Sequence, residues 1–168
     1  MAQYAEIFFD AASLQCINTN SAPLLLLDGT NVDTLVRAFD DTTEEYVNGK
    51  FQVPGDIDTS GTVTLRAYVT SESGGASDDV ALTFGHVAKN GGEDYDAAYT
   101  DEDSGDKLVD DDAGDLTEIT WTETVANLAW AANDIVFFRL SRPAAASDNL
   151  ADDMYLFSFC IEIPITDA

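Results

Sequence analysis

The chain has 168 residues, a length that suits one domain, because a chain of this size can bury roughly two thirds of its unfolded surface in a single core. Hydrophobic residues make up 45% of the sequence and aromatic residues 10%, which excludes an intrinsically disordered acidic chain. With 32 Asp and Glu against 7 Lys and Arg, the net charge of −25 disfavours binding to nucleic acid or to an anionic membrane surface.

The N-terminal sequence MAQYAEIFFDAAS shows no basic region followed by a long apolar stretch, so we expect no secretory leader. No segment reaches the roughly 20 apolar residues of a membrane span. The two cysteines, Cys16 and Cys160, lie far apart in the chain and outside any CxxC spacing. Free, buried thiols are the expectation for both, and a disulfide is the alternative.

The first 45 residues mix the apolar runs AEIFF, PLLLL and LVRAF with Asn, Thr and Asp turns. They predict either additional strands or an arm that reaches a partner. Two-residue alternation then dominates the chain, and it places apolar side chains on one face of each strand. The predicted inward faces are Val47, Phe51 and Val53; Val63, Leu65, Ala67 and Val69; Val80, Leu82 and Phe84; Ile119 and Trp121; and Tyr155, Phe157, Phe159, Ile161 and Ile163.

Turn-rich loops separate these strands, at 71–79 and at 89–115. Residues 125–132 fit a helical spacing, but Trp121 to Val125 also reads as a strand. The segment DIVFFRL (134–140) is apolar on both faces, which indicates either a central strand or a subunit contact. Many short strands with few helices predict a β-sandwich or barrel.

The loop GDIDTSG begins like a calcium-binding loop, with Asp56 and Asp58 as candidate ligands. The position where an EF-hand carries its closing Glu is Ala67, on the predicted inward face of a strand. A turn between two strands is the favoured interpretation, and a different calcium geometry stays open.

Enzymatic chemistry has few candidates. His86 is the only histidine, so it is either a metal ligand, a general base, or a hydrogen-bonded residue at the end of a strand. A dyad of His86 with one of the cysteines is the nucleophilic alternative. Paired carboxylates could hydrolyse glycosides, but the acidic loops predict a solvated surface instead. Their members are Asp101, Glu102, Asp103, Asp110, Asp111, Asp112 and Asp115.

Two further groups have a predicted role. Exposed aromatic residues could stack on sugars; among Trp121, Trp130, Tyr95 and Tyr99, alternation assigns Trp121 to the core and leaves Trp130 as the main candidate. Arg139 and Arg142 are expected to pair with nearby carboxylates and to order the loop 143–153. The candidate carboxylates are Asp134, Asp148, Asp152 and Asp153.

Three runs carry a resemblance to a known group of proteins. They are AFDDTTEEYVNGKFQVPGDIDTSGTVTLRAYV (38–69), GGASDDVALTFGHVAKNGGEDYD (74–96) and AANDIVFFRLSRPAAASDNLADDMYLFSFCIEI (131–163). In order and spacing the chain resembles jelly-roll virion proteins of tailed bacteriophages. The resemblance implies a jelly-roll β-sandwich of about eight antiparallel strands, usually trimeric, that serves as a capsid decoration (cement) protein or as a head or tail fibre domain.

On this reading the chain divides into residues 1–37, an arm or extra strands that dock on the capsid or on another subunit, and residues 38–168, the jelly roll. The expected function is non-enzymatic, without a cofactor unless calcium binds. The expected partners are a homotrimer and the major capsid protein, on the outer surface of a virion made in the host cytoplasm. A sugar-binding module for host attachment is the alternative. The predicted interface residues are Ile7, Phe8, Phe9, Leu24, Leu25, Leu26, Leu27, Ile135 and Phe137.

Overall fold

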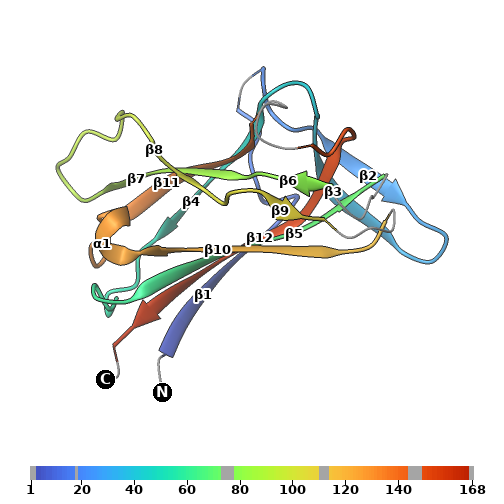
Figure 1. Cartoon of the computed structure of the whole chain (residues 1–168). Coiled ribbons are helices and arrows are strands. Elements are labelled where there is room, and N and C mark those ends of the chain that lie inside the picture. Colours follow the sequence, from blue (N-terminus) through green and yellow to red (C-terminus); the bar gives the residue numbers. More distant parts are fainter. Residues whose placement is uncertain (1–2, 18, 73–77, 110–113, 144–148, 167–168) are drawn as a thin grey trace.

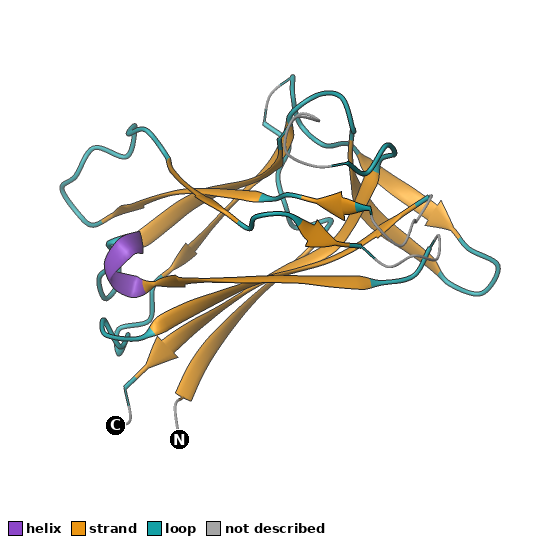
Figure 2. Cartoon of the chain, viewed as in Figure 1, coloured by secondary structure: helices purple, strands orange, loops and turns teal. Residues whose placement is uncertain are grey.

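A computed structural model describes residues 3–17, 19–72, 78–109, 114–143 and 149–166. Nearly all of its regular structure is β (Figures 1 and 2). The elements are β1 (Gln3–Asp10), β2 (Leu24–Asp28), β3 (Asp33–Phe39), β4 (Glu45–Gln52), β5 (Thr62–Ser71), β6 (Asp79–Val80), β7 (Thr83–Lys89), β8 (Thr100–Asp103), β9 (Lys107–Leu108), β10 (Thr117–Thr124), α1 (Val125–Leu128), β11 (Ile135–Arg142) and β12 (Met154–Ile165).

The strands form two antiparallel sheets in jelly-roll order. The first sheet runs β10-β5-β12-β3-β2, the second runs β4-β11-β7-β8, and β6 and β9 make a separate short pair. Successive strands cross between the sheets from β3 to β4 to β5, and again from β10 to β11 to β12, as two Greek keys require. The predicted all-β jelly roll of about eight antiparallel strands is confirmed, and β2 is an additional strand at the edge of the first sheet.

Strands β1 and β3 lie one after the other along the same edge of β12. β3 pairs with Met154–Leu156, whereas β1 pairs with β12 from Ser158 to Ile165. Between the two, Ala11 N–H donates to the Phe157 carbonyl. The first strand position of the jelly roll is therefore built in two pieces, and residues 11–32 form an excursion between them. The domain boundary expected after residue 37 falls inside β3.

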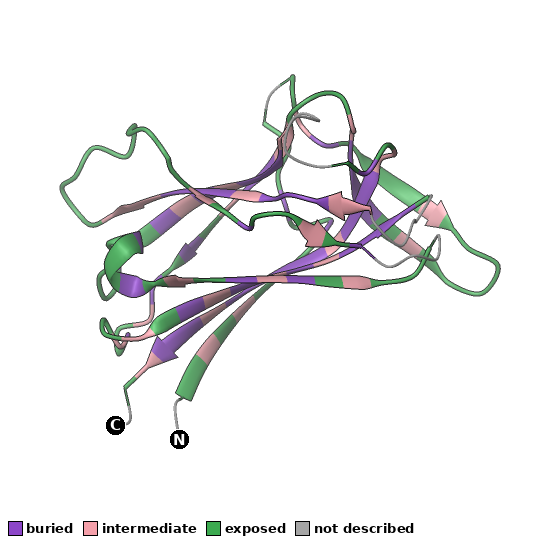
Figure 3. Ribbon diagram, viewed as in Figure 1, coloured by how far each residue is buried: buried purple, intermediate pink, exposed green. Residues whose placement is uncertain are grey.

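One continuous core fills the space between the sheets, as the purple segments in Figure 3 show. The alternation predicted for β5 is confirmed, since Val63, Leu65, Ala67 and Val69 are all fully buried. Phe138 of β11 lies at the centre, and its ring is 5.0 Å from that of Phe9 on β1. Apolar side chains from both sheets interdigitate here, which is how a sandwich stabilises itself.

Gly49 of β4 makes room for this central ring. It is the residue opposite Phe138 in the sheet register. A Cβ atom at this position would come within 2.3 Å of the Phe138 ring, so a larger residue would displace the ring.

The predicted inward face of β12 is wrong in its first half. A β-bulge between Leu156 and Ser158 shifts the register against β5, so Met154 and Leu156 face the main core together with Phe159 and the residues after it. Tyr155 and Phe157 instead face outward, in a smaller apolar cluster with Val36, Ala38 and Leu27. A single unpaired residue reverses the sides of a strand, and alternation in the sequence does not reveal it.

The other element predictions need smaller corrections. The helix is limited to α1, which Thr124 caps and Ala129 ends in a left-handed conformation, while the competing strand ends at Thr124 as β10. DIVFFRL is a central strand, because β11 lies between β4 and β7. The loop expected at 89–115 contains β8 and β9, and residues 110–113 of it lie outside the described range.

The cysteines are both free. Cys160 is buried as predicted, but Cys16 is exposed. Burial, then a hydrogen bond from the thiol to Glu6 Oε1 at 3.2 Å, raises the pKa of Cys160 to about 12. Within the described ranges, the structure contains no helix long and apolar enough to cross a membrane.

Candidate functional site

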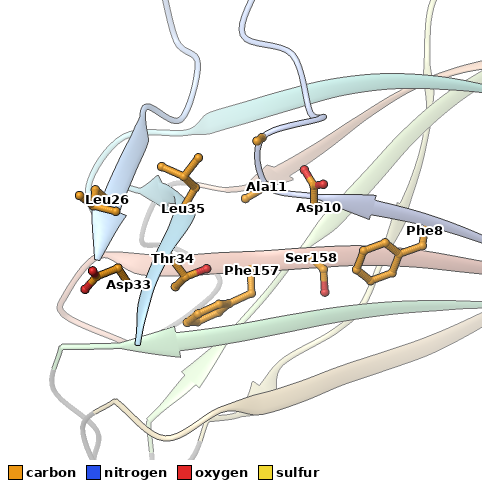
Figure 4. Close-up of a pocket in the computed structure, with 10 residues that line it drawn as sticks. Phe8, Asp10, Ala11, Leu26, Asp33, Thr34, Leu35, Phe157 and Ser158 are labelled. Carbon is orange, nitrogen blue, oxygen red and sulfur yellow. The ribbon is translucent and has the colours of Figure 1, made fainter. Parts of the chain in front are cut away.

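An apolar hollow of about 490 Å³ opens where β1 gives way to β3 along β12 (Figure 4). It exists because the two strands do not meet, and the excursion between them brings β2 alongside β3. Its lining residues are Phe8, Asp10, Ala11, Ala12, Leu26, Asp33, Thr34, Leu35, Phe157 and Ser158. We call this surface, together with the outer edge of β2, the β1–β3 surface.

Alternation along β1 decides which of its residues reach this surface. Phe8 is 62% exposed and lines the hollow. Ile7 and Phe9 point to the other side, where they pack against the main core. Of the three residues predicted at an interface, only Phe8 is exposed, because neighbouring residues of a strand face opposite sides.

Strand β2 is the outermost strand of the first sheet, and its far edge is unpaired by any described strand. Leu24, Leu25 and Leu26 of this strand are 40%, 40% and 63% exposed. Leu27 is half-buried against the outward cluster of Tyr155. An exposed apolar edge strand is a ready template for pairing with another chain.

Ile135 and Phe137 belong to a different surface. They lie on β11, in the second sheet, where Ile135 is 36% exposed and Phe137 is half-buried. Their outward position follows from the register, because Val136 and Phe138 between them face the core. The exposed members of the predicted interface set are thus divided between the two sheets.

The loop of Asp56 and Asp58 joins β4 to β5, across the two sheets. Asp58 Oδ1 accepts hydrogen bonds from the backbone and hydroxyl of Ser60, and these bonds lower the pKa of Asp58. The Asp56 carbonyl accepts the backbone N–H of Thr166. Ala67, at the twelfth position from Asp56, is fully buried. These contacts are those of a turn at a corner of the sandwich, as the sequence predicted.

Sequence reasoning missed a carboxylate cluster at the other end of the molecule. Oxygens of Asp40, Asp41 and Asp153 lie within 4.8 Å of one another. Asp40 Oδ1 is held by the backbone N–H groups of Thr42 and Thr43. Burial and then the nearby Asp40 and Asp41 raise the pKa of Asp153. Of the three residues, only Asp40 and Asp41 are neighbours in the sequence, because Asp153 comes from the segment just before β12.

His86 and Trp130 form a buried pair, which corrects the prediction for Trp130. Trp130 is 3% exposed, and its Nε1–H donates to His86 Nδ1 at 3.4 Å. Trp130 therefore presents no face to a sugar. Trp121 is buried as predicted, while Tyr95 and Tyr99 are 72% and 36% exposed.

The environment of His86 agrees with a structural role. Burial lowers its pKa, so the ring is neutral at pH 7. Its Nε2 atom lies 3.9 Å from Glu102 Oε1, and burial raises the pKa of Glu102. His86 faces the core, whereas Cys160 lies on the outer face of β12 beside Glu6, so the two do not form the hypothetical dyad.

Both arginines have partners besides the candidate carboxylates, of which Asp148 lies outside the described residues. Arg139 pairs with Asp101 at 3.2 Å instead of a carboxylate near its own strand. Arg142 is fully buried and donates to the carbonyls of Phe39, Asp152 and Leu150. Its predicted role in ordering the loop before β12 is retained for residues 150–153, but through backbone carbonyls.

Comparisons with known proteins give no family. No family model and no curated protein match the chain. Among solved structures, the CBM22-1 xylan-binding domain from Paenibacillus barcinonensis Xyn10C has 11% identity and a TM-score of 0.42, over 95% of this chain and 87% of that one. The glycoside hydrolase domain of Endo-D from Streptococcus pneumoniae has 13% identity and a TM-score of 0.37, over 94% of this chain and 21% of that one. Likenesses of this size carry no information about function.

Proposed function

We propose that the chain is a non-enzymatic structural protein that assembles through its β1–β3 surface, as a capsid decoration protein that binds as a trimer on the outside of a virion. The observation that carries the proposal is the open edge of β2, where the exposed Leu26 lines the same hollow as Phe8 and Leu35. Contiguous exposed apolar surface of this kind marks protein contacts. The resemblance to phage virion proteins supplies the partner.

The charge of the chain supports the same role. A net charge of −25 keeps assembled particles apart in solution and repels free nucleic acid. Three identical copies docked on a symmetric lattice would gain avidity from modest single contacts, and they would bridge capsomers without any chemistry.

Light scattering in solution tests the assembly. The wild-type protein should have three times the chain mass of 18.1 kDa. Leu26→Gln on β2 should shift it towards the monomer, because it places a polar group in the contact. Leu108→Gln is the matched control, since Leu108 is 66% exposed on β9 and Leu26 is 63% exposed. Equal masses for both variants would remove the β1–β3 surface from the proposal.

Purified virus particles test the location. A decoration protein should be present in stoichiometric amounts relative to the major capsid protein, whereas a few copies per particle would place it in a tail or fibre. Capsids stripped of the protein should bind the wild type again and bind Leu26→Gln more weakly. Absence of the wild-type protein from purified particles would refute the virion role.

A further inference from the structure

A second hollow, of about 230 Å³, lies on the outer face of the other sheet. It is formed where β7 runs into the loop 90–99 and where β11 begins, at the end of the sandwich that carries α1 (Figure 1). None of its lining residues belongs to the β1–β3 surface. It therefore needs an explanation that assembly through that surface does not provide.

Exposed aromatic rings dominate this region. Tyr95 is 72% exposed, and its ring centroid lies 6.5 Å from that of half-buried Phe137. Tyr99 is 36% exposed, and the Arg139 guanidinium lies 5.3 Å above its ring, held in place by Asp101. Both tyrosines carry a hydroxyl, so the rings offer flat apolar faces with a polar rim.

The polar side chains around the rings both donate and accept hydrogen bonds. Lys89, Asn90, Glu93 and Asn133 line the hollow beside Tyr95. The amides can act in both directions, the ammonium group donates and the carboxylate accepts. Lys89 and Glu93 also balance each other in charge, in a chain that is otherwise strongly acidic. This composition suits a ligand with many hydroxyl groups and no net charge.

The loop is held in shape by its own hydrogen bonds. Glu93 Oε2 accepts the backbone N–H of Asn90 at 2.9 Å, and the Tyr95 carbonyl accepts the backbone N–H of Ala97 at 3.0 Å. A loop that is already ordered loses less entropy when a ligand binds. Tyr95 is thus exposed to solvent on a turn that its own hydrogen bonds hold in shape.

We propose that this surface binds a neutral oligosaccharide, with the C–H face of a pyranose ring stacked on Tyr95 and Phe137 and its hydroxyl groups bonded to Asn90 and Glu93. The volume is below the roughly 300–1,000 Å³ of pockets for drug-sized ligands, and it suits one or two sugar rings. A polyanionic glycan is disfavoured by the net charge of the chain. A protein partner would require a broader apolar patch than these rings provide.

Calorimetric titration of the full chain with cellohexaose, xylohexaose and mannohexaose tests the proposal, with polygalacturonate as the acidic comparison. At least one neutral probe should bind. Tyr95→Ala should weaken its binding roughly tenfold, as expected for the loss of one stacking ring. Tyr95→Phe should bind like the wild type, because it keeps the ring.

The matched control is Tyr4→Ala, which removes a tyrosine that is 52% exposed on the outer face of the first sheet. It should leave the affinity unchanged. Binding of none of the three neutral probes, equal affinity for Tyr95→Ala and the wild type, or preference for polygalacturonate would overturn the proposal. None of these outcomes depends on the oligomeric state, so failure here leaves the structural role untouched.

Discussion

Asp153 has a carboxyl group whose ionised form is disfavoured by its surroundings in the folded protein. It is half-buried beside Asp40 and Asp41, and the Asp40 carboxylate is already fixed by Thr42 and Thr43. Burial and these neighbours raise the pKa of Asp153 above its ordinary value, while Arg142 only partly offsets them. A group whose pKa is raised by folding contributes stability below its unfolded pKa, and this contribution is lost as the pH rises through its folded pKa.

We therefore predict that Asp153→Asn stabilises the protein at pH 7. At this pH the wild-type carboxyl is ionised, and its ionisation lowers the free energy of unfolding. The melting temperature should rise by roughly 1–3 °C at pH 7. The gain should vanish near pH 3, where the wild-type carboxyl is protonated as well. Thermal unfolding of both proteins across this pH range measures the effect.

Asp58→Asn is the control, because the pKa of Asp58 is shifted in the opposite direction from that of Asp153. The hydrogen bonds from Ser60 lower the pKa of Asp58, so its stabilising contribution is present at neutral pH and is lost on acidification. This variant should therefore be no more stable than the wild type at pH 7. A loss of stability in Asp153→Asn at pH 7 would show that the carboxylate cluster is stabilising and would contradict the prediction.

At the scale of elements, the excursion between β1 and β3 is held by one buried arginine. Arg37 of β3 is 7% exposed, and it donates to the carbonyls of Ala11, Leu14 and Ala22. The excursion also meets β4, where Gln15 forms a bridge with Asn48. The first 37 residues are consequently folded against the sandwich over their described length.

Removing the Arg37 guanidinium should release this excursion. We predict that Arg37→Met lowers the free energy of unfolding by about 2–4 kcal/mol, because it leaves several buried carbonyls without a donor. Hydrogen exchange should accelerate at Gln15 and Ala22, whose backbone N–H groups bond to β4. Chemical denaturation and exchange mass spectrometry measure the two effects.

Arg66→Met is the matched control for this prediction. Arg66 pairs with Glu118 and Glu162 on the outer face, where it is partly exposed. Loss of such a surface pair should cost at most about 1 kcal/mol. If both variants lost the same stability and the excursion stayed protected in Arg37→Met, the excursion would be held by its apolar contacts instead.

Some of the strands could be predicted from the sequence and others could not. Strand β5 was predictable because it is a central strand with an uninterrupted alternation of buried and outward residues. The bulge in β12 was not, since it is a register shift against β5 that alternation in the sequence does not reveal. Strand β8 was missed because its residues TDED are acidic and it pairs with β7 only at the edge of the sheet.

The candidate site, too, could be predicted from the sequence only in part. The sequence analysis named Phe8 and Leu26 among the predicted interface residues. It could not show the hollow beside them, because four strands from both ends of the chain build it. Trp130 was misplaced for a related reason: its ring is buried by contacts with Phe51 and His86, from distant strands.

At the scale of the whole molecule, the charge of the chain opposes its compact form. The net charge is −25, and four of the seven basic residues, Lys50, Lys89, Arg139 and Arg142, lie on the second sheet. With 32 acidic residues against seven basic ones, most acidic groups have no partner of opposite sign. Repulsion among such groups destabilises the folded state, and salt screens it beyond about 10 Å at 0.1 M.

We predict that the melting temperature rises by about 5 °C between 10 mM and 0.5 M NaCl at pH 7. Tetramethylammonium chloride at the same ionic strength should have the same effect, because screening does not depend on the identity of the cation. A larger effect of sodium than of tetramethylammonium would indicate cation binding instead. The surface pairs Arg66–Glu118 and Arg139–Asp101 act in the opposite direction, since salt weakens them. A melting temperature that falls with salt would mean that these few pairs outweigh the general repulsion, and it would refute the prediction.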